Sequence, residues 1–185
     1  MGLIRNIRKG LTFLRNDLRV GPEDAALVHE YLSPVERELF YRLSVPDQVH
    51  SVRVARICMQ SLPHFPELDH RRMVRGALLH DIGKVDVHLG IVFRTIWTLL
   101  SRILRDAPER LGSRYLDARP GTLRHRMYVQ SQHPALGAEL LAQMGTEEGV
   151  CKLVRNTGLP PDGPRDTADR VLLAADSDRV VDRLP

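Results

Sequence analysis

Apolar residues recur every three or four positions along most of the chain, with polar residues between them. That spacing buries one face of an α-helix. It is clearest near the start, where an apolar stripe alternates with basic positions: Leu3, Ile4, Ile7, Leu11, Leu14 and Leu18 against Arg5, Arg8, Lys9, Arg15 and Arg19. No stretch alternates β-branched and polar residues as a half-buried strand does. The sequence therefore predicts an all-α fold.

Capping residues mark several helix starts. The run Ser-Pro-Val-Glu at residues 33–36 forms a capping box with proline at the first helical position, and it predicts a helix to about Leu43. Residues 44–47 repeat the pattern and predict a helix to about Leu62. Asp69 stands at an N-cap position, so a helix is expected after it, and the last helix is expected to start at Asp166.

The second half of the chain contains three further boundary signals. Pro120-Gly121 marks a turn before one helix. Pro134, read as a first helical residue, places His133 at the entrance of the next helix with its ring free to turn inward. Thr146 is expected to open a short helix that ends near Asn156.

Length and composition set the class of protein. A chain of 185 residues and 21.0 kDa is expected to form one domain, residues 1–185. Cys58 and Cys151 lie far apart and are typical of reduced thiols in a cytosolic protein. The longest apolar stretch, residues 88–105, is interrupted by arginines, and no secretory signal is apparent, so a cytoplasmic location is expected.

The net charge of +4 comes almost entirely from arginine. Arginine favours bidentate contacts with phosphate or carboxylate, although a charge of this size also fits an ordinary soluble protein. The basic amphipathic helix over residues 1–18 could lie on an anionic membrane, but packing against the body or a second subunit is favoured. The basic segment 86–127 could be a lid, a homodimer seam or core packing, of which core packing is favoured. Nucleic-acid binding is disfavoured because Trp97 is the single tryptophan and no stacking platform is evident.

The strongest chemical signal is the run Ala-Leu-Leu-His-Asp-Ile-Gly-Lys at residues 77–84. His80 and Asp81 follow an apolar run, so both side chains are expected to leave one buried helix and reach a single metal ion. Lys84 is expected on the same face. The small residues at 76 and 77 would keep that face open, and Gly83 would cap the helix.

Two more residues are candidates for the same ion. Asp176 shares a predicted helical stripe with Leu172, Leu173 and Val180, and a carboxylate in a core face is costly unless a cation or several donors hold it. His50 lies near the start of a predicted helix and faces apolar neighbours, although such a histidine is more often a hydrogen-bonded core residue. Asp178 is expected to point elsewhere, at the surface.

Two imidazoles and two carboxylates suit Mn²⁺, Fe²⁺, Ni²⁺, Zn²⁺ or Mg²⁺ with open positions for water, and the lack of a thiolate argues against structural zinc. The order His…His-Asp…Asp resembles the HD-domain metal-dependent phosphohydrolases. The matching phrases are Val-His-Ser-Val-Arg-Val-Ala at 49–55, Leu-His-Asp-Ile-Gly-Lys at 79–84 and Ala-Ala-Asp at 174–176. The middle phrase resembles the His-Asp-Ile-Gly-Lys subgroup, and the Gly-Tyr-Pro signature of the cyclic-di-GMP phosphodiesterases is missing after it.

The resemblance implies an HD-domain-like helical bundle over residues 44–184, with a helical extension over 1–43 and a basic helical insertion. It implies that one divalent metal ion is bound by His50, His80, Asp81 and Asp176. His133, in His-Pro-x-x-Gly-Ala, matches the histidine that two-metal subgroups use for a second ion. A further histidine is usual in those subgroups where this chain has Arg-Asn-Thr at 155–157, so one ion is expected.

The resemblance also implies a function. A phosphate ester or anhydride of a nucleotide-like substrate would be hydrolysed by a metal-activated water. Asp81 would hold the ion, Lys84 and Arg53 would hold phosphoryl oxygens, and His133 could give a proton to the leaving oxygen. Read without the resemblance, Lys84 could be a solvated helix end, and Arg53 and His133 could be structural. A non-catalytic module that binds metal and a nucleotide is the alternative function.

Overall fold

The computed structural model describes residues 20–85, 87, 93, 97, 112, 114–159 and 163–183. All regular elements in these ranges are helical, which confirms the predicted all-α fold. The elements are α2 (Pro22–Tyr31), α3 (Pro34–Arg42), α4 (Val45–Ser61), η1 (Leu62–His64), α5 (His70–Leu79), η2 (Ile82–Lys84), α8 (Leu123–Gln143), α9 (Glu148–Asn156) and α10 (Thr167–Asp176).

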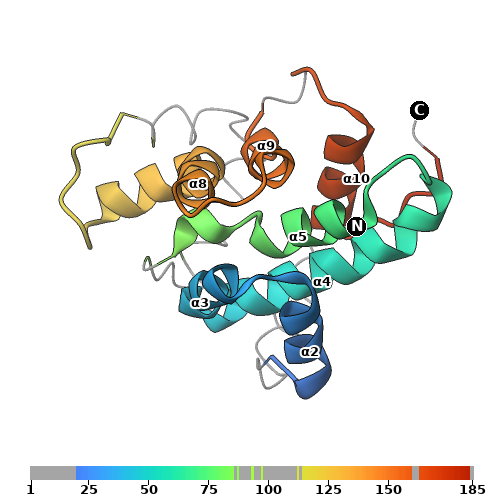
Figure 1. Cartoon of the computed structure of the whole chain (residues 1–185). Helices are drawn as coiled ribbons and strands as arrows, with labels where there is room; N and C mark the ends of the chain where they lie inside the picture. The colour runs from blue at the N-terminus through green and yellow to red at the C-terminus, as the bar shows by residue number, and fades with distance from the viewer. Residues whose placement is uncertain are drawn as a thin grey trace, which may run out of the picture.

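Helix α5 lies at the centre of this arrangement. Figure 1 shows it between α4 on one side and the pair α8 and α9 on the other, with α10 beside them. Helices α2 and α3 also contact α5, while α8 packs against η2 and α9. The central position of α5 explains its composition, because Met73, Val74, Ala77, Leu78 and Leu79 are all almost inaccessible to solvent. Each large apolar side chain buried in this way contributes about 1.5–3 kcal/mol.

One hydrophobic cluster joins the described helices. It extends from Val28 in α2 and Phe40 in α3 through α4 and α5 to Val154 in α9 and Leu172 in α10. Helices α2 and α3, which fall in the predicted extension 1–43, therefore pack into the same core as the later helices. The division of the chain at residues 43 and 44 stays a prediction.

Three of the predicted capping residues cap their helices as expected, whereas Ser44, at the start of α4, makes no side-chain cap bond to the backbone and donates to Asp47 Oδ2 over 2.5 Å. Ser33 and Glu36 form the capping box, with Glu36 N–H donating to Ser33 Oγ over 3.3 Å and Ser33 N–H donating to Glu36 Oε2 over 2.9 Å. Asp69 accepts from the N–H of Arg72 over 2.8 Å, and Asp166 accepts from the N–H of Asp169 over 3.0 Å. Each side chain satisfies a backbone donor that the first helical turn leaves without an intrahelical partner.

The predicted helix start at His133 is wrong. Residues Leu123–Gln143 form one continuous helix that contains Pro134, so His133 lies in its interior. The last helix also differs, because α10 ends at Asp176 and Val180 lies beyond it, 51% exposed. The start predicted at Thr146 is displaced by two residues, to Glu148.

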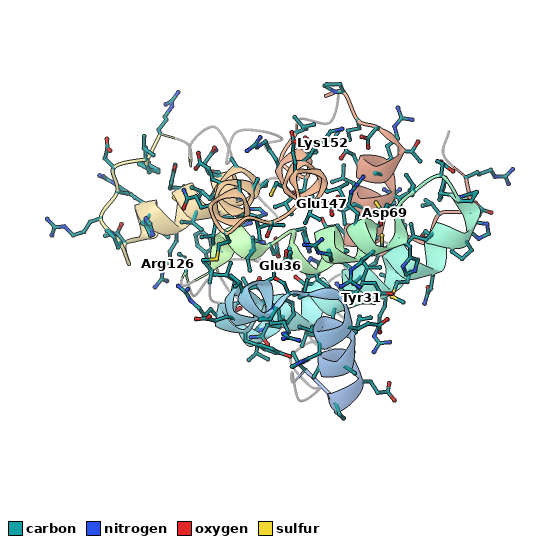
Figure 2. All side chains as sticks on the ribbon, viewed as in Figure 1. Tyr31, Glu36, Asp69, Arg126, Glu147 and Lys152 are labelled. Atoms are coloured by element: carbon teal, nitrogen blue, oxygen red, sulfur yellow. The ribbon has the colours of Figure 1, made fainter. Side chains whose placement is uncertain are left out.

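A buried ion pair ties three parts of the bundle together. Glu36 on α3 accepts from Arg75 Nη2 on α5 over 2.7 Å and from Thr146 Oγ1 over 3.0 Å. Arg75 Nη1 also lies 3.3 Å from Glu147 Oε2, just before α9. Figure 2 shows Glu36 and Glu147 near the middle of the view, where these elements meet.

Several expectations lie outside the described residues. The basic helix predicted over 1–18 is among them, as is most of the basic segment 86–127. In the part of the chain that is described, no helix combines the length and apolar character needed to cross a membrane.

Candidate metal centre

Three predicted ligands meet although they come from three helices. His50 lies on α4, His80 directly follows α5, and Asp176 is the last residue of α10. One ligand atom from each lies within 4.8 Å of the other two. His50 Nε2 is 2.9 Å from Asp176 Oδ1, and His80 Nε2 is 3.6 Å from the same oxygen. At these distances the three side chains converge on one point, as the ligands of a single cation do.

His80 and Asp81 do not leave one helix, contrary to the prediction. Helix α5 ends at Leu79, His80 is its C-cap, and Asp81 precedes η2. Because the last carbonyls of a helix have no intrahelical donor, the Nδ1–H of His80 can donate to Ala77 O, which lies 2.8 Å away. In the neutral ring this bond places the proton on Nδ1 and leaves Nε2 as the acceptor that a cation would take.

The Nε2 atom of His80 is the atom whose surroundings best fit a bound cation. It is buried and has no hydrogen-bond partner among the described residues, while Asp81 Oδ1 and Asp176 Oδ1 each lie 3.6 Å from it. A buried acceptor without a partner costs about 1–3 kcal/mol. A divalent ion would bind this nitrogen and the two carboxylates together. The side chains at this site therefore fit a divalent metal ion.

His50 is held differently. Its Nδ1 lies 3.4 Å from Arg53 Nη2, and because a guanidinium can only donate, Nδ1 is the acceptor in this contact. Nε2 then carries the proton and donates to Asp176. Binding of a cation through Nε2 would require the ring proton to move to Nδ1 and the Arg53 contact to open.

Asp81 connects the three-residue group to a second set of side chains. Its Oδ1 lies 2.6 Å from Lys84 Nζ and 3.2 Å from His133 Nε2. The Lys84 side chain is only 11% exposed, so it is not a solvated helix end. The group of atoms within 4.8 Å of one another does not include Asp81, which is joined to it through His80.

The electrostatics keep both carboxylates charged. Burial raises the pKa of Asp81, but the charges of Lys84 and His80 outweigh it and hold the pKa well below its ordinary value. Partial burial raises the pKa of Asp176, which is 40% exposed rather than enclosed in the core. The hydrogen bond with His50 and the nearby ring of His80 outweigh this effect and hold the pKa below its ordinary value. Burial lowers the pKa of His80, and the two carboxylates reverse this and raise it to about 9. The site therefore attracts positive charge.

The position of His133 inside α8 depends on Pro134. Proline has no N–H, so the carbonyl of Gln130 lacks its usual helical donor. The Nδ1–H of His133 can donate to that carbonyl over 2.9 Å, which points Nε2 toward Asp81. Burial, followed by the charge of Lys84, lowers the pKa of His133.

Gly83 and Gly76 do not have the predicted roles of a helix cap and an opening beside the ligands. Each instead allows two elements to pack closely. A Cβ on Gly83 would lie 2.0 Å from the carbonyl oxygen of His133, and one on Gly137 would lie 2.9 Å from Gly83 N. Gly83 is therefore not a helix cap; with Gly137 it lets η2 touch α8 and brings His133 beside Asp81. A Cβ on Gly76 would point toward Leu153 on α9 rather than toward the candidate ligands.

Asp178 is exposed, as expected, but it is not remote from the site. Its Oδ1 lies 3.1 Å from Arg53 Nε, so it holds the arginine that contacts His50. Sequence reasoning missed Asp178, Gln130 and Gly137 as part of this region. The only signal for Asp178 was its place two residues after Asp176.

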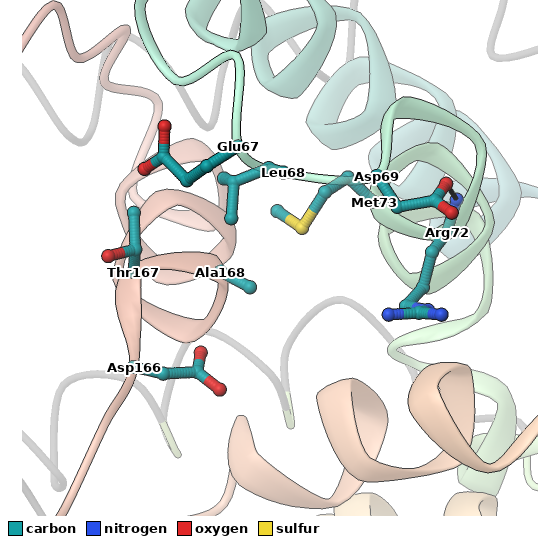
Figure 3. Close-up of a pocket in the computed structure, with 8 residues that line it drawn as sticks. All are labelled: Glu67, Leu68, Asp69, Arg72, Met73, Asp166, Thr167 and Ala168. Carbon is teal, nitrogen blue, oxygen red and sulfur yellow. Dashed lines mark hydrogen bonds between the residues drawn. The ribbon is translucent and has the colours of Figure 1, made fainter.

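A separate hollow of about 320 Å³ lies where the N-terminal ends of α5 and α10 meet (Figure 3). It is lined by Glu67, Leu68, Asp69, Arg72, Met73, Asp166, Thr167 and Ala168. None of these eight residues is a predicted ligand or catalytic residue, so the hollow is distinct from the metal centre.

An all-α bundle that gathers histidine and aspartate side chains around a buried acceptor defines a class of metal-binding helical domains. The family model of the HD domain matches residues 48–181, and the chain belongs to this family. This confirms the resemblance to the HD-domain superfamily, whose members are typically metal-dependent hydrolases. Neither the curated proteins nor the solved structures contain a match. The His-Asp-Ile-Gly-Lys subgroup stays a prediction.

Proposed function

We propose that this chain is a phosphohydrolase that cleaves a phosphate ester or anhydride of a nucleotide-like substrate in the cytoplasm. The observation that carries the proposal is the buried, unpartnered Nε2 of His80, which faces two charged carboxylates beside His50. One divalent ion, Mn²⁺, Fe²⁺, Ni²⁺, Zn²⁺ or Mg²⁺, would be held by His50, His80, Asp81 and Asp176.

The bound ion would supply Lewis acidity, which activates water and withdraws charge from a phosphoryl oxygen. The side chains of this chain would do the rest. Lys84 and Arg53 would bind the remaining phosphoryl oxygens as their charge grows. His133 Nε2, which lies 3.2 Å from Asp81 Oδ1, could give a proton to the leaving oxygen when the ring is protonated, and its lowered pKa makes the charged ring a stronger acid. Asp81 would keep Lys84 and His133 on the same side of the centre, since it contacts both.

Residues 155–157 support a single ion. Asn156 Nδ2 donates to Asp169 Oδ2 over 2.9 Å, and Thr157 Oγ1 donates to Val154 O over 2.7 Å. Both side chains are therefore engaged with their own surroundings, where two-metal relatives of the subgroup would be expected to supply a histidine.

The test combines elemental analysis of the purified chain with a panel of nucleotides and generic phosphoesters, each assayed with the five candidate metals. His80→Ala and Asp81→Ala are expected to lose bound metal and turnover together. His64→Ala, which changes an exposed histidine, should leave both unchanged. Full activity in either site variant would refute the metal assignment.

A non-catalytic module that binds metal and a nucleotide is the second candidate. The observation in its favour is that both cations proposed to bind phosphate already have acidic partners, Lys84 with Asp81 and Arg53 with Asp178. If the wild-type chain binds a nucleotide tightly and no substrate in the panel turns over, the regulatory function is the correct one.

A further inference from the structure

Asp178 occupies an unusual backbone position directly after α10. Its φ is 59°, the single positive value recorded for a residue other than glycine in the described ranges. Asp178 N–H donates to Ala175 O and Arg179 N–H donates to Ala174 O, each over 2.9 Å. These two bonds form the motif that ends many helices, in which glycine usually takes the left-handed residue.

The backbone conformation of Asp178 is unfavourable for a residue with a side chain. A side chain with a Cβ is disfavoured at positive φ, whereas glycine adopts it without steric cost. The ion pair between Asp178 and Arg53 is largely exposed, with 30% and 44% of the side chains accessible, and exposed pairs add little to folding. Glycine would adopt this backbone conformation without that steric cost.

What the carboxylate does is to hold Arg53 beside the metal centre. Asp178 Oδ1 forms an ion pair with Arg53, 3.1 Å from Nε, while Arg53 Nη2 lies 3.4 Å from Nδ1 of the candidate ligand His50. A guanidinium has five N–H donors, and these contacts engage two of them. Arg53 is thus fixed at its Nε end and keeps donors for an anion.

We infer that Asp178 is a positioning residue that holds the Arg53 guanidinium where a phosphoryl group would meet the metal centre. The inference rests on the proposed function, because it gives Arg53 a phosphate to bind. It makes Asp178 part of the phosphate-binding region although Asp178 itself touches no phosphate.

The experiment uses the full chain with Mn²⁺ and inorganic phosphate as the probe. Asp178→Gly, Arg53→Ala and the double variant are compared by Tm, metal content and the Kd for phosphate. Asp178→Gly should keep its metal, raise Tm by about 2 °C and weaken phosphate binding about tenfold. Arg53→Ala should weaken binding at least as much. Adding Asp178→Gly to Arg53→Ala should weaken it no further, because Asp178 acts only through Arg53.

A second ion pair on the same helix provides a matched control. Arg56 Nη2 lies 2.7 Å from Asp24 Oδ1, and the two side chains are 45% and 29% exposed, almost as in the Arg53 pair. Arg56→Ala and Asp24→Ala should leave phosphate affinity unchanged. Asp178→Asn, which tolerates positive φ and keeps an acceptor for Arg53, should give an affinity between those of wild type and Asp178→Gly.

Three results would overturn the inference: unchanged phosphate affinity in Asp178→Gly, a lowered Tm in that variant, or losses that add in the double variant. A wild-type chain that binds no phosphate would overturn it as well. If phosphate affinity follows the expected pattern but no phosphoester is hydrolysed, the inference stands and the proposed catalytic function fails, which separates the two.

Discussion

His80 and His133 are oriented by the same local device. In each, Nδ1 faces the carbonyl oxygen of the residue three positions earlier, Ala77 over 2.8 Å and Gln130 over 2.9 Å. The two carbonyls are available for different reasons, since one lies at a helix end and the other faces a proline. In both cases Nε2 is left pointing at Asp81. Backbone geometry therefore selects the reactive nitrogen before any ligand binds.

Lys84 gives a prediction at the same scale. Lys84→Met keeps the apolar stem and removes the ammonium that lies 2.6 Å from Asp81. Metal content should stay at the wild-type level, and kcat/KM for the best phosphoester of the panel should fall about 100-fold, because a charge that stabilises the transition state is lost. Lys152→Met, at a side chain that is 62% exposed, is the control. An unchanged kcat/KM would show that Lys84 serves only to pair with Asp81.

The candidate ligands could be named from the sequence, but the side chains that contact and position them could not. His50, His80 and Asp176 stood out because their residue types and order matched a known pattern. The bond between Arg53 and Asp178 depends on where α10 ends relative to α4. Nothing in the local sequence around either residue fixes that distance.

The same contrast holds for the elements. Starts at Ser33, Asp69 and Asp166 could be predicted because a cap is made by residues three positions apart. The continuous helix α8 could not be predicted, because a proline such as Pro134 is more typical of the first position of a helix than of its interior. The close approach of Gly83 and Gly137 involves two elements far apart in the chain, so only the packed structure shows why both are glycine.

Glu36 allows a prediction about how α3, α5 and the segment before α9 are held together. Burial raises its pKa, but the Ser33 N–H and Arg75 bring the pKa below the ordinary value of 4.5. Glu36→Gln removes the shorter of the two carboxylate contacts of Arg75, which is 16% exposed, and leaves the 3.3 Å contact with Glu147. It should lower the free energy of unfolding at pH 7 by about 2–4 kcal/mol in urea titrations.

The pH dependence of that difference follows from the direction of the shift. A carboxyl group whose pKa is lowered by folding stabilises the fold fully above its unfolded pKa, and this contribution is lost as the pH falls through the folded value. The gap between wild type and Glu36→Gln should thus be constant above about pH 6 and shrink progressively below about pH 4.5. Glu38→Gln, at an exposed position of the same helix, should show no such gap. A gap that persists in acid would contradict the ion pair.

At the scale of the whole molecule, the candidate ligands connect helices that are distant in the chain. His50 and Asp176 are 126 residues apart, yet their side chains are in hydrogen-bond contact. An ion bound to His50, His80 and Asp176 would join α4, the end of α5 and α10. Because the unfolded chain cannot hold these groups together, binding of the ion must stabilise the fold.

The size of this effect can be predicted. Mn²⁺ at 100 times its Kd should raise the free energy of unfolding by about 2.7 kcal/mol, which corresponds to a rise in Tm of about 5–10 °C for a chain of this size. EDTA should reverse the rise in the wild-type chain. His80→Ala and Asp176→Ala should show neither response, whereas Asp182→Ala, at an exposed position beyond α10, should behave as wild type. An equal rise in Tm for wild type and His80→Ala would place the ion elsewhere, since only ligation at this centre makes the stabilisation depend on a buried ring nitrogen.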